Sequence, residues 1–294
     1  MKTFILSCCS TVDVSAEQLK KEDIHYICFH FSLDGKPYND DLGKTVSYES
    51  FYKALRNGAE TKTSQVNVSE FIEYFTHFLE SGLDILHVSL SSGISGAYNS
   101  ALIAKNELIK KYPERKIYII DSLAASSGYG LLMDKAATLR EQGWSIDEIY
   151  NWINENKLNL HHWFFSTDLS YFVKGGRISK TAGFIGSMLK ICPLLNVNAE
   201  GKLIPISKPR SKEKAISELV KRMEDNAING LDYADKCYIC HSDCLEDAKK
   251  VADLIESKFK KLDGKVLINT IGTTIGSHTG PGTIALFFWG NTRN

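Results

Sequence analysis

The sequence has no excess of charge of either sign, because Lys plus Arg and Asp plus Glu each number 35 among 294 residues. Nucleic acids and anionic membrane surfaces are bound by clustered basic residues, so we expect neither as a partner. The sequence also lacks a long hydrophobic run. No uncharged apolar stretch reaches the roughly 18 to 20 residues that a membrane-spanning helix needs, which predicts no membrane insertion.

An export signal is also missing, since the apolar run Phe4–Leu6 near the N-terminus is too short for the core of a signal peptide. We interpret this run as a first strand. The cysteines number seven, and an odd count without an export signal favours reduced thiols over a disulfide framework. The sequence therefore predicts a cytoplasmic protein.

One cysteine pattern, Cys237-x-x-Cys240-His241, is similar to a haem attachment motif and to part of a zinc site. In an extended strand Cys237 and Cys240 point to opposite faces, and no second cysteine pair lies at a zinc-ribbon spacing. We therefore predict structural cysteines here, with no metal site and no cofactor.

Segments typical of strands alternate with segments typical of helices along the whole chain, which predicts an α/β protein with helix-covered parallel sheets. The length suits two domains, and a change of character after Asn159 predicts 1–160 and 161–294 as their ranges. The expected strands are Leu83–Leu90, Lys116–Ile120, Trp163–Thr167, Lys236–His241, Lys265–Ile271 and Thr283–Trp289, and the expected helices are Ser69–Glu80, Ala97–Lys111, Ala124–Gln142, Lys212–Asn226 and Leu245–Lys260.

Three segments rich in hydroxyl groups or glycine adjoin these elements. The first, Ser91–Ala97, lies between a strand and a helix, where glycines let the backbone approach a ligand and free N–H groups attract an anion. Ser95 could equally be a simple helix cap. The second, Thr61–Gln65, places hydroxyls at another helix entrance. The third, Gly272–Gly282, has one histidine among many glycines and is predicted to be a functional loop.

Together with Gly175-Gly176-Arg177-Ile178, these segments resemble, in order and spacing, the DegV family of fatty-acid-binding proteins over essentially the entire chain. The resemblance implies two α/β domains, a buried acyl chain, and a carboxylate held by hydroxyls and a histidine. Thr63, Ser95 and His278 match the family positions that hold the carboxylate. It also implies presentation of a long-chain fatty acid to a separate fatty acid kinase, without intrinsic catalysis. The full set of implied ligand-binding residues is Thr63, Ser64, Ser92, Gly93, Ser95, Gly96, Arg177, His278 and Thr279, and Arg210 matches a position associated with docking the kinase.

Two positions depart from the family pattern. Cys8-Cys9 stands where the family usually has Asp-Ser, and Val66 stands where it usually has Pro, which leaves the preferred acyl chain open. The residues themselves favour a carboxylate over a phosphate, because the 92–99 segment contains no Lys or Arg. The acyl tail needs an apolar slot. Phe184, Ile185, Met188, Leu189 and Ile191 could supply one, or could be ordinary core.

Two alternatives stay open beside this interpretation. Arg210 could be no more than a solvated charge before a helix. Ser95, His278 and Asp121 all follow expected strands, where catalytic groups gather in α/β folds, so they could form a hydrolase or acyltransferase triad. Ser95 does not lie in a Gly-x-Ser-x-Gly elbow, which makes the enzyme the second choice.

Overall fold

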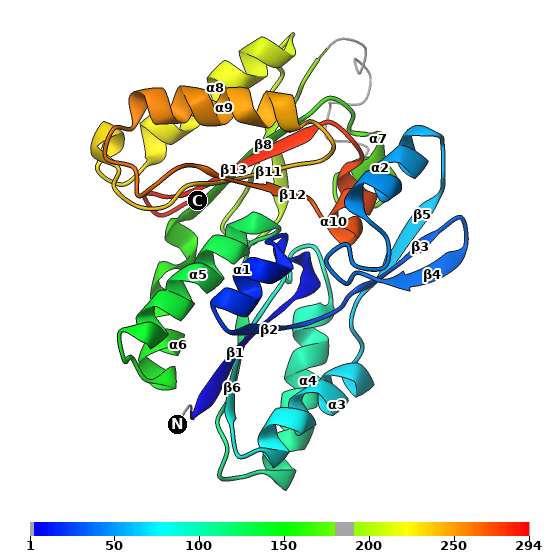
Figure 1. Cartoon of the computed structure of the whole chain (residues 1–294), viewed down its shortest axis with the longest axis vertical. Coiled ribbons are helices and arrows are strands. Elements are labelled where there is room, and N and C mark those ends of the chain that lie inside the picture. Colours follow the sequence, from blue (N-terminus) through cyan, green and yellow to red (C-terminus); the bar gives the residue numbers. More distant parts are fainter. Residues whose placement is uncertain (1–2, 180–190, 294) are drawn as a thin grey trace.

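The structure, a computed structural model, describes residues 3–179 and 191–293. Its first sheet occupies the lower half of the molecule in Figure 1. This sheet contains β1 (Phe4–Cys9), β2 (Ile24–Ile27), β6 (Asp84–Ser89) and β7 (Ile117–Asp121), in the order β2-β1-β6-β7. All of its pairings are parallel, as the alternating sequence pattern predicts for helix-covered strands.

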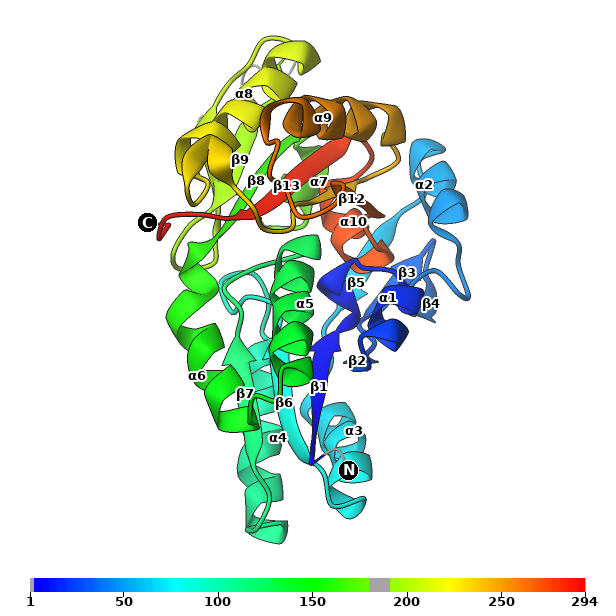
Figure 2. The same cartoon turned by 60° about the vertical axis from the view of Figure 1, so that its left-hand side comes forward.

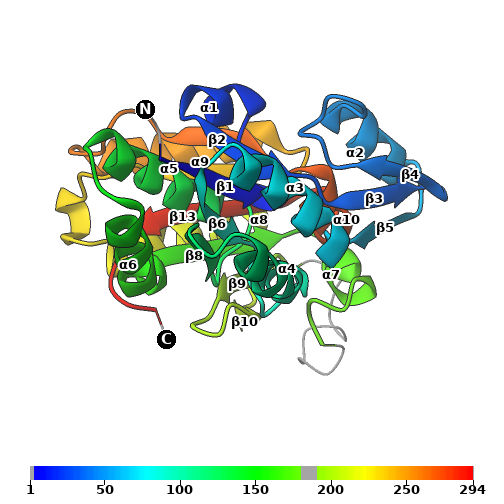
Figure 3. The ribbon, with the colours of Figure 1, turned by 90° about the horizontal axis from the view of Figure 1, so that it is seen from below.

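Helices cover both faces of the first sheet, as the view from below shows (Figure 3). On one side lie α1 (Ala16–Lys21) and α5 (Ser127–Glu141), and on the other lie α3 (Val68–Glu80) and α4 (Ala97–Lys111). In α3, Asn67 and Glu70 form a capping box, and Phe71, Phe75 and Phe78 make one buried stripe at helical spacing. The helix α6 (Ile146–Asn156) then packs beside α5.

The second sheet lies above the first and has the order β10-β9-β8-β13-β11-β12 (Figures 1 and 2). Its strands are β8 (Leu160–Ser166), β9 (Leu194–Val197), β10 (Leu203–Ser207), β11 (Tyr238–His241), β12 (Leu267–Thr270) and β13 (Thr283–Trp289). The helices α8 (Lys212–Asn226) and α9 (Leu245–Lys258) cover its outer face, while α5 packs against its inner face. Only the pair β11–β12 is parallel. The expectation of parallel sheets throughout therefore applies to the first sheet alone.

A third, small antiparallel sheet, β4-β3-β5, was not expected from the sequence. It contains β3 (His30–Leu33), β4 (Lys36–Asn39) and β5 (Thr61–Ser64), and α2 (Tyr48–Arg56) packs on it. Its short strands carry much exposed surface, so their apolar signal is weak. The segment expected at a helix entrance, Thr61–Gln65, thus begins as the edge strand β5.

The segment expected to be a glycine-rich loop contains a helix instead, α10 (Thr273–Thr279), which packs on the five-residue helix α7 (Ser170–Lys174). Tertiary contacts override the poor helix propensity of glycine here. A Cβ on Gly276 would lie 2.6 Å from the Tyr52 hydroxyl oxygen, so only glycine lets α10 approach α2. The Asp13 carboxylate accepts a hydrogen bond from the Gly272 N–H, and Asp40 accepts one from the Thr273 hydroxyl.

Most other predicted elements agree with the structure to within a few residues at each end. In the described ranges, no helix is long and apolar enough to cross a membrane. The first sheet uses strands up to Asp121 and the second uses strands from Leu160 onward. The division into domains at residue 160 stays a prediction.

Candidate functional site

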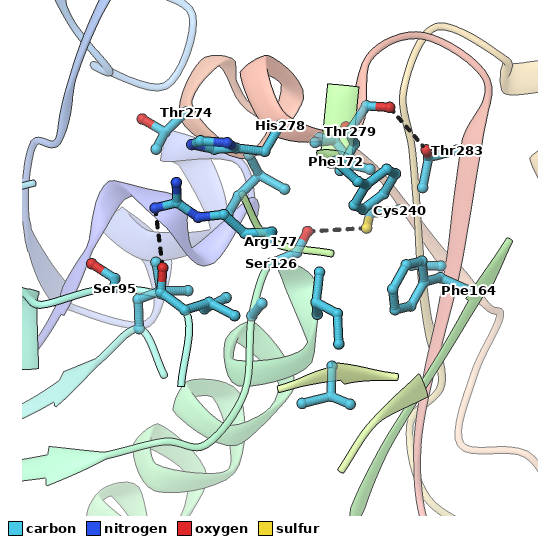
Figure 4. Close-up of a pocket in the computed structure, with 18 of the residues that line it drawn as sticks. Ser95, Ser126, Phe164, Phe172, Arg177, Cys240, Thr274, His278, Thr279 and Thr283 are labelled. Atoms are coloured by element: carbon cyan, nitrogen blue, oxygen red, sulfur yellow. Dashed lines mark hydrogen bonds between the residues drawn. The ribbon is translucent and has the colours of Figure 1, made fainter. Parts of the chain in front are cut away.

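A cavity of about 390 Å³ lies between the two large sheets. It opens where the parallel strands of the first sheet end, the place where α/β folds usually bind their ligands. Leu90 and Ile94 line it after the end of β6, and Phe164 and Phe287 line it from the second sheet. Figure 4 shows Phe164 in this wall. Its volume is within the roughly 300 to 1,000 Å³ of small-molecule sites.

Six of the nine predicted ligand-binding residues line this cavity, although they come from four separate segments. They are Thr63 and Ser64 of β5, Ser95 before α4, Arg177 after α7, and His278 and Thr279 of α10. The strand β5 and the helix α10 are in direct contact, which explains why segments about 215 residues apart meet at one wall.

His278 is a neutral hydrogen-bonding group in this wall. Its Nε2 lies 2.8 Å from the Thr63 hydroxyl oxygen. Burial, with a smaller effect of the Arg177 charge, lowers the pKa of His278 to about 4. Its Nδ1 is buried and has no hydrogen-bond partner among the described residues. A Cβ on Gly175 would lie only 2.2 Å from this nitrogen, so the absence of a side chain at Gly175 provides the space that the imidazole ring occupies.

Arg177 brings the only charged side chain to the described wall of the cavity. Its Nη1 donates a hydrogen bond to the Gly175 carbonyl at 2.7 Å, and its Nη2 donates one to the Ile94 carbonyl at 3.1 Å. It forms no ion pair with a carboxylate in the described part of the chain, and burial lowers its pKa. Figure 4 shows its guanidinium beside His278 and above Ser95. The wall therefore presents an uncompensated positive charge.

The other three predicted residues do not line this cavity, and each makes a structural contact instead. The Ser92 N–H donates to Asp121 Oδ1 at 3.0 Å, and the Ser92 side chain is exposed. Gly93 and Gly96 are closely packed against other segments. A Cβ on Gly93 would lie 2.6 Å from the Gly201 carbonyl oxygen, and a Cβ on Gly96 would lie 2.6 Å from Gln65 Oε1. Arg210 is exposed between β10 and α8, outside the cavity wall.

Several residues outside the predicted ligand-binding set also line the cavity. Gln65 belongs to the recognised Thr-Ser-Gln segment, and its Nε2 donates to the Ser100 hydroxyl at 3.0 Å. Ser126 carried no sequence signal. It has a positive φ of 57°, donates a hydrogen bond to Asp13, and lies 3.1 Å from the Cys240 sulfur. Burial raises the pKa of the Cys240 thiol, so it is a neutral wall residue.

The catalytic triad considered from the sequence is not assembled. His278 Nε2 contacts Thr63, whereas the Ser95 hydroxyl accepts a hydrogen bond from the Ala97 N–H at 3.2 Å. Asp121 accepts hydrogen bonds from the backbone N–H groups of Ser92 and Leu123. No group of three or more metal-ligating side chains occurs within residues 3–179 and 191–293.

Phenylalanine side chains form much of the apolar wall. Phe164, Phe172 and Phe287 line the cavity, and the first two stack with ring centroids 5.8 Å apart. Of the slot predicted from the sequence, Phe184, Ile185, Met188 and Leu189 lie outside the described residues. The fifth, Ile191, is half-buried and does not line the cavity.

The comparison with known proteins agrees with this architecture. The family model described as "Uncharacterised protein, DegV family" matches residues 9–291. The chain belongs to the DegV family. A DegV domain-containing protein of Clostridium perfringens is 41% identical over 293 residues, covering 100% of this chain and 99% of that protein.

Solved structures confirm the predicted α/β DegV fold. A DegV lipid-binding protein from Thermotoga maritima has a TM-score of 0.85 at 28% identity, with 100% of both chains covered. A second Thermotoga maritima protein, whose structure is reported to reveal a fatty acid binding function, has a TM-score of 0.82 at 27% identity. That comparison covers 99% of this chain and 100% of the other.

Proposed function

We propose that the protein binds a long-chain fatty acid, with the carboxylate at Arg177 and the tail along the apolar part of the cavity. The observation that carries this proposal is the half-buried guanidinium of Arg177, which has no carboxylate partner in the described chain and faces an otherwise uncharged wall. Leaving a charge unpaired in such surroundings is costly, and a ligand carboxylate removes that cost.

The neighbouring polar groups suit a carboxylate of single negative charge. The Ser95 hydroxyl can donate a hydrogen bond without adding positive charge, and so can one member of the hydrogen-bonded Thr63–His278 pair, whose second proton is used between them. The remaining wall is largely apolar and aromatic, as the tail of a fatty acid requires. The two Thermotoga maritima structures support the same class of ligand.

The proposal extends to a carrier role, in which the chain presents the acid to a fatty acid kinase and performs no chemistry alone. Ser64, at the polar wall, is exposed, so the carboxyl end lies close to the protein surface. The exposed Arg210 would dock the kinase. We also propose that the protein is cytoplasmic, where its seven cysteines, all of them free thiols, stay reduced.

Mass spectrometry of the organic extract from natively purified protein tests the binding proposal. We expect a long-chain fatty acid at near one molecule per chain. Arg177→Leu, which keeps bulk and removes the charge, should be recovered folded and without lipid. An empty cavity in the wild type, together with no binding of added acids of any length, would contradict the proposal.

A further inference from the structure

Two buried carboxylates, those of Asp13 and Asp40, meet at the start of α10. A Cβ on Gly272, the residue before α10, would lie 2.7 Å from Asp13 Oδ1 and 3.6 Å from Asp40 Oδ1. Both side chains are buried, and neither forms an ion pair within the described part of the chain. Asp13 lies shortly after β1 of the first sheet, and Asp40 follows β4 of the small sheet. The two carboxylates therefore reach α10 from two different sheets.

Each carboxylate accepts hydrogen bonds from the beginning of α10. Asp13 Oδ1 accepts one from the Gly272 N–H at 2.9 Å, and Asp40 Oδ1 accepts one from the Thr273 hydroxyl at 2.9 Å. Asp40 Oδ2 accepts a longer one from the Thr274 N–H at 3.4 Å. The N–H groups of a first helical turn have no partner inside the helix, so a buried helix start needs such acceptors. The carboxylates therefore fix where α10 begins, and α10 carries the histidine of the cavity wall.

Asp13 also holds a second wall of the cavity, at the start of α5. Its Oδ2 accepts a hydrogen bond from the hydroxyl of Ser126, which lines the cavity. Ser126 has a φ of 57° and a ψ of −151°, a conformation that is costly for residues other than glycine. Such a residue persists where its surroundings hold it, and the Asp13 carboxylate is in contact with it here. One side chain thus joins α5 to α10.

We propose that Asp13 and Asp40 are positioning residues for the lipid site, which hold α10 and the start of α5 in the arrangement that forms the cavity wall. Neither carboxylate lines the cavity, so both act through the residues that they hold. The expected effect on fatty acid affinity rests on the proposed function. The expected effect on His278, which meets Thr63 at 2.8 Å, is independent of any ligand.

Titration of the delipidated full chain with hexadecanoate tests the effect on affinity. Asp13→Ala removes both contacts of the carboxylate and should weaken binding by about tenfold or more. Asp13→Asn should bind within about threefold of wild type, because its oxygen can accept from the Gly272 N–H and its amide group can donate to Ser126 Oγ. The matched control is Asp134→Ala, with affinity within about twofold of wild type. Asp134 is also buried, pairs with Lys236 and does not line the cavity.

NMR titration of the His278 ring in the ligand-free chain gives a second readout, which a general loss of stability would not change. Asp13→Ala should let α10 move and water reach the ring, which raises the pKa of His278 from about 4 toward the ordinary value of about 6.5. Asp13→Asn and Asp134→Ala should keep the wild-type pKa. If Asp13→Ala does not fold, Thr273→Val breaks the contact with the Asp40 carboxylate alone. It should raise the same pKa and weaken binding about threefold.

The outcomes separate this proposal from the proposed function. A folded Asp13→Ala variant, or Thr273→Val in its place, that keeps the wild-type pKa of His278 would overturn the positioning role whatever its affinity. Equal weakening by Asp13→Ala and Asp13→Asn would also overturn it, because the charge and not the hydrogen bonds would then matter. If the wild type binds no fatty acid, the proposed function is wrong, and the His278 pKa values still decide whether the carboxylates position α10.

Discussion

Thr63 and His278 meet at 2.8 Å in the cavity wall although 215 positions separate them in the chain. The contact holds the imidazole ring in place and leaves the threonine hydroxyl at the polar end of the cavity. Neither residue is charged in the free protein, because the pKa of His278 lies near 4. In the proposed complex, the charge that attracts the carboxylate would come from Arg177, and the Thr63–His278 pair would supply a hydrogen bond.

Replacing Thr63 with Val should weaken fatty acid binding roughly tenfold to a hundredfold, because a hydrogen bond to a charged group contributes about 1.5 to 3 kcal/mol. Ser95→Ala and His278→Ala should have effects of similar size. Thr61→Val is the matched control on the same strand, since the Thr61 hydroxyl contacts Ser277, outside the cavity wall. Titration with a fluorescent fatty acid measures the affinities. Wild-type affinity in all three folded site variants would place the carboxylate elsewhere.

The pH dependence of binding should follow His278. The ordinary pKa of histidine is about 6.5, whereas burial lowers the pKa of His278 in the free protein to about 4. A bound carboxylate favours the protonated ring and raises this pKa. Binding of the fatty acid is then coupled to uptake of a proton by His278. The affinity should therefore be constant at alkaline pH and increase as the pH falls from the His278 pKa in the complex toward the His278 pKa of about 4 in the free protein. The increase ends where the fatty acid itself becomes protonated.

NMR titration of the His278 ring with and without hexadecanoate, alongside affinity measurements from pH 8.5 downward, checks this prediction. His278→Gln keeps a side-chain hydrogen-bond donor and should remove the pH dependence. An affinity that falls with falling pH, or an unchanged slope in the variant, would show that another group titrates.

At the scale of elements, the turn after α7 and the helix α10 form one unit. Gly175 leaves space for the His278 ring, Arg177 follows two residues later, and Gly280 accommodates Tyr171 of α7. A Cβ on Gly280 would lie 2.2 Å from the Tyr171 ring, so α7 and α10 approach each other at two glycines. The unit places the cation and the imidazole side by side.

Gly175→Ala should displace the His278 ring and weaken fatty acid binding about tenfold, because the new methyl group would lie 2.2 Å from Nδ1. The backbone itself should tolerate alanine, since Gly175 has an ordinary helical φ of −75°. Gly176→Asn is the matched control. Gly176 has a φ of 70°, which asparagine adopts readily, and no atom lies within 4 Å of its Cβ position. Crystal structures and titrations of both variants test the assignment, and equal binding by both would contradict it.

At the scale of the whole molecule, the cavity exists because the two large sheets face each other. The Ser91 hydroxyl donates to the Gly201 carbonyl at 2.9 Å, and the Asp13 carboxylate receives the Gly272 N–H at 2.9 Å, so contacts between the halves flank the site. Arg177, at the polar end of the cavity, also lines a second pocket together with residues 202–205, where β10 begins. A partner that acts on the carboxyl group would approach from there.

Arg210→Ala should leave fatty acid binding unchanged and weaken acyl-phosphate formation by the proposed partner kinase, because Arg210 is exposed and lines neither the cavity nor the second pocket beside it. We expect a loss of a few-fold to tenfold, the range for an exposed ion pair or charge-assisted contact at an interface. Lys214→Ala provides the matched control on the neighbouring helix. Loss of lipid from the Arg210 variant, or kinase activity equal to wild type, would overturn the docking assignment.

The sequence alone determined the alternation of elements, three of the four strands of the first sheet (β1, β6 and β7, but not β2) and the segments that carry the polar wall. These features depend on local signals, namely apolar runs such as Ile85–Val88, capping residues such as Asn67, and glycine clusters, which act over a few positions. The grouping of Thr63, Ser95 and His278 at one carboxylate is implied by the resemblance to the family and not by these local signals.

Only the tertiary structure decided how those segments act. It turned the glycine-rich segment into α10, because packing against Tyr52 and hydrogen bonds from Gly272 and Thr273 to buried carboxylates outweigh local propensity. It also set the pKa of His278, because burial by distant segments removes the water that would stabilise its charge. Finally, the tertiary structure left Arg177 without a carboxylate partner in the described chain. The absence of a partner depends on the side chains that all other segments bring to the cavity, so the residues next to Arg177 in the sequence could not predict it.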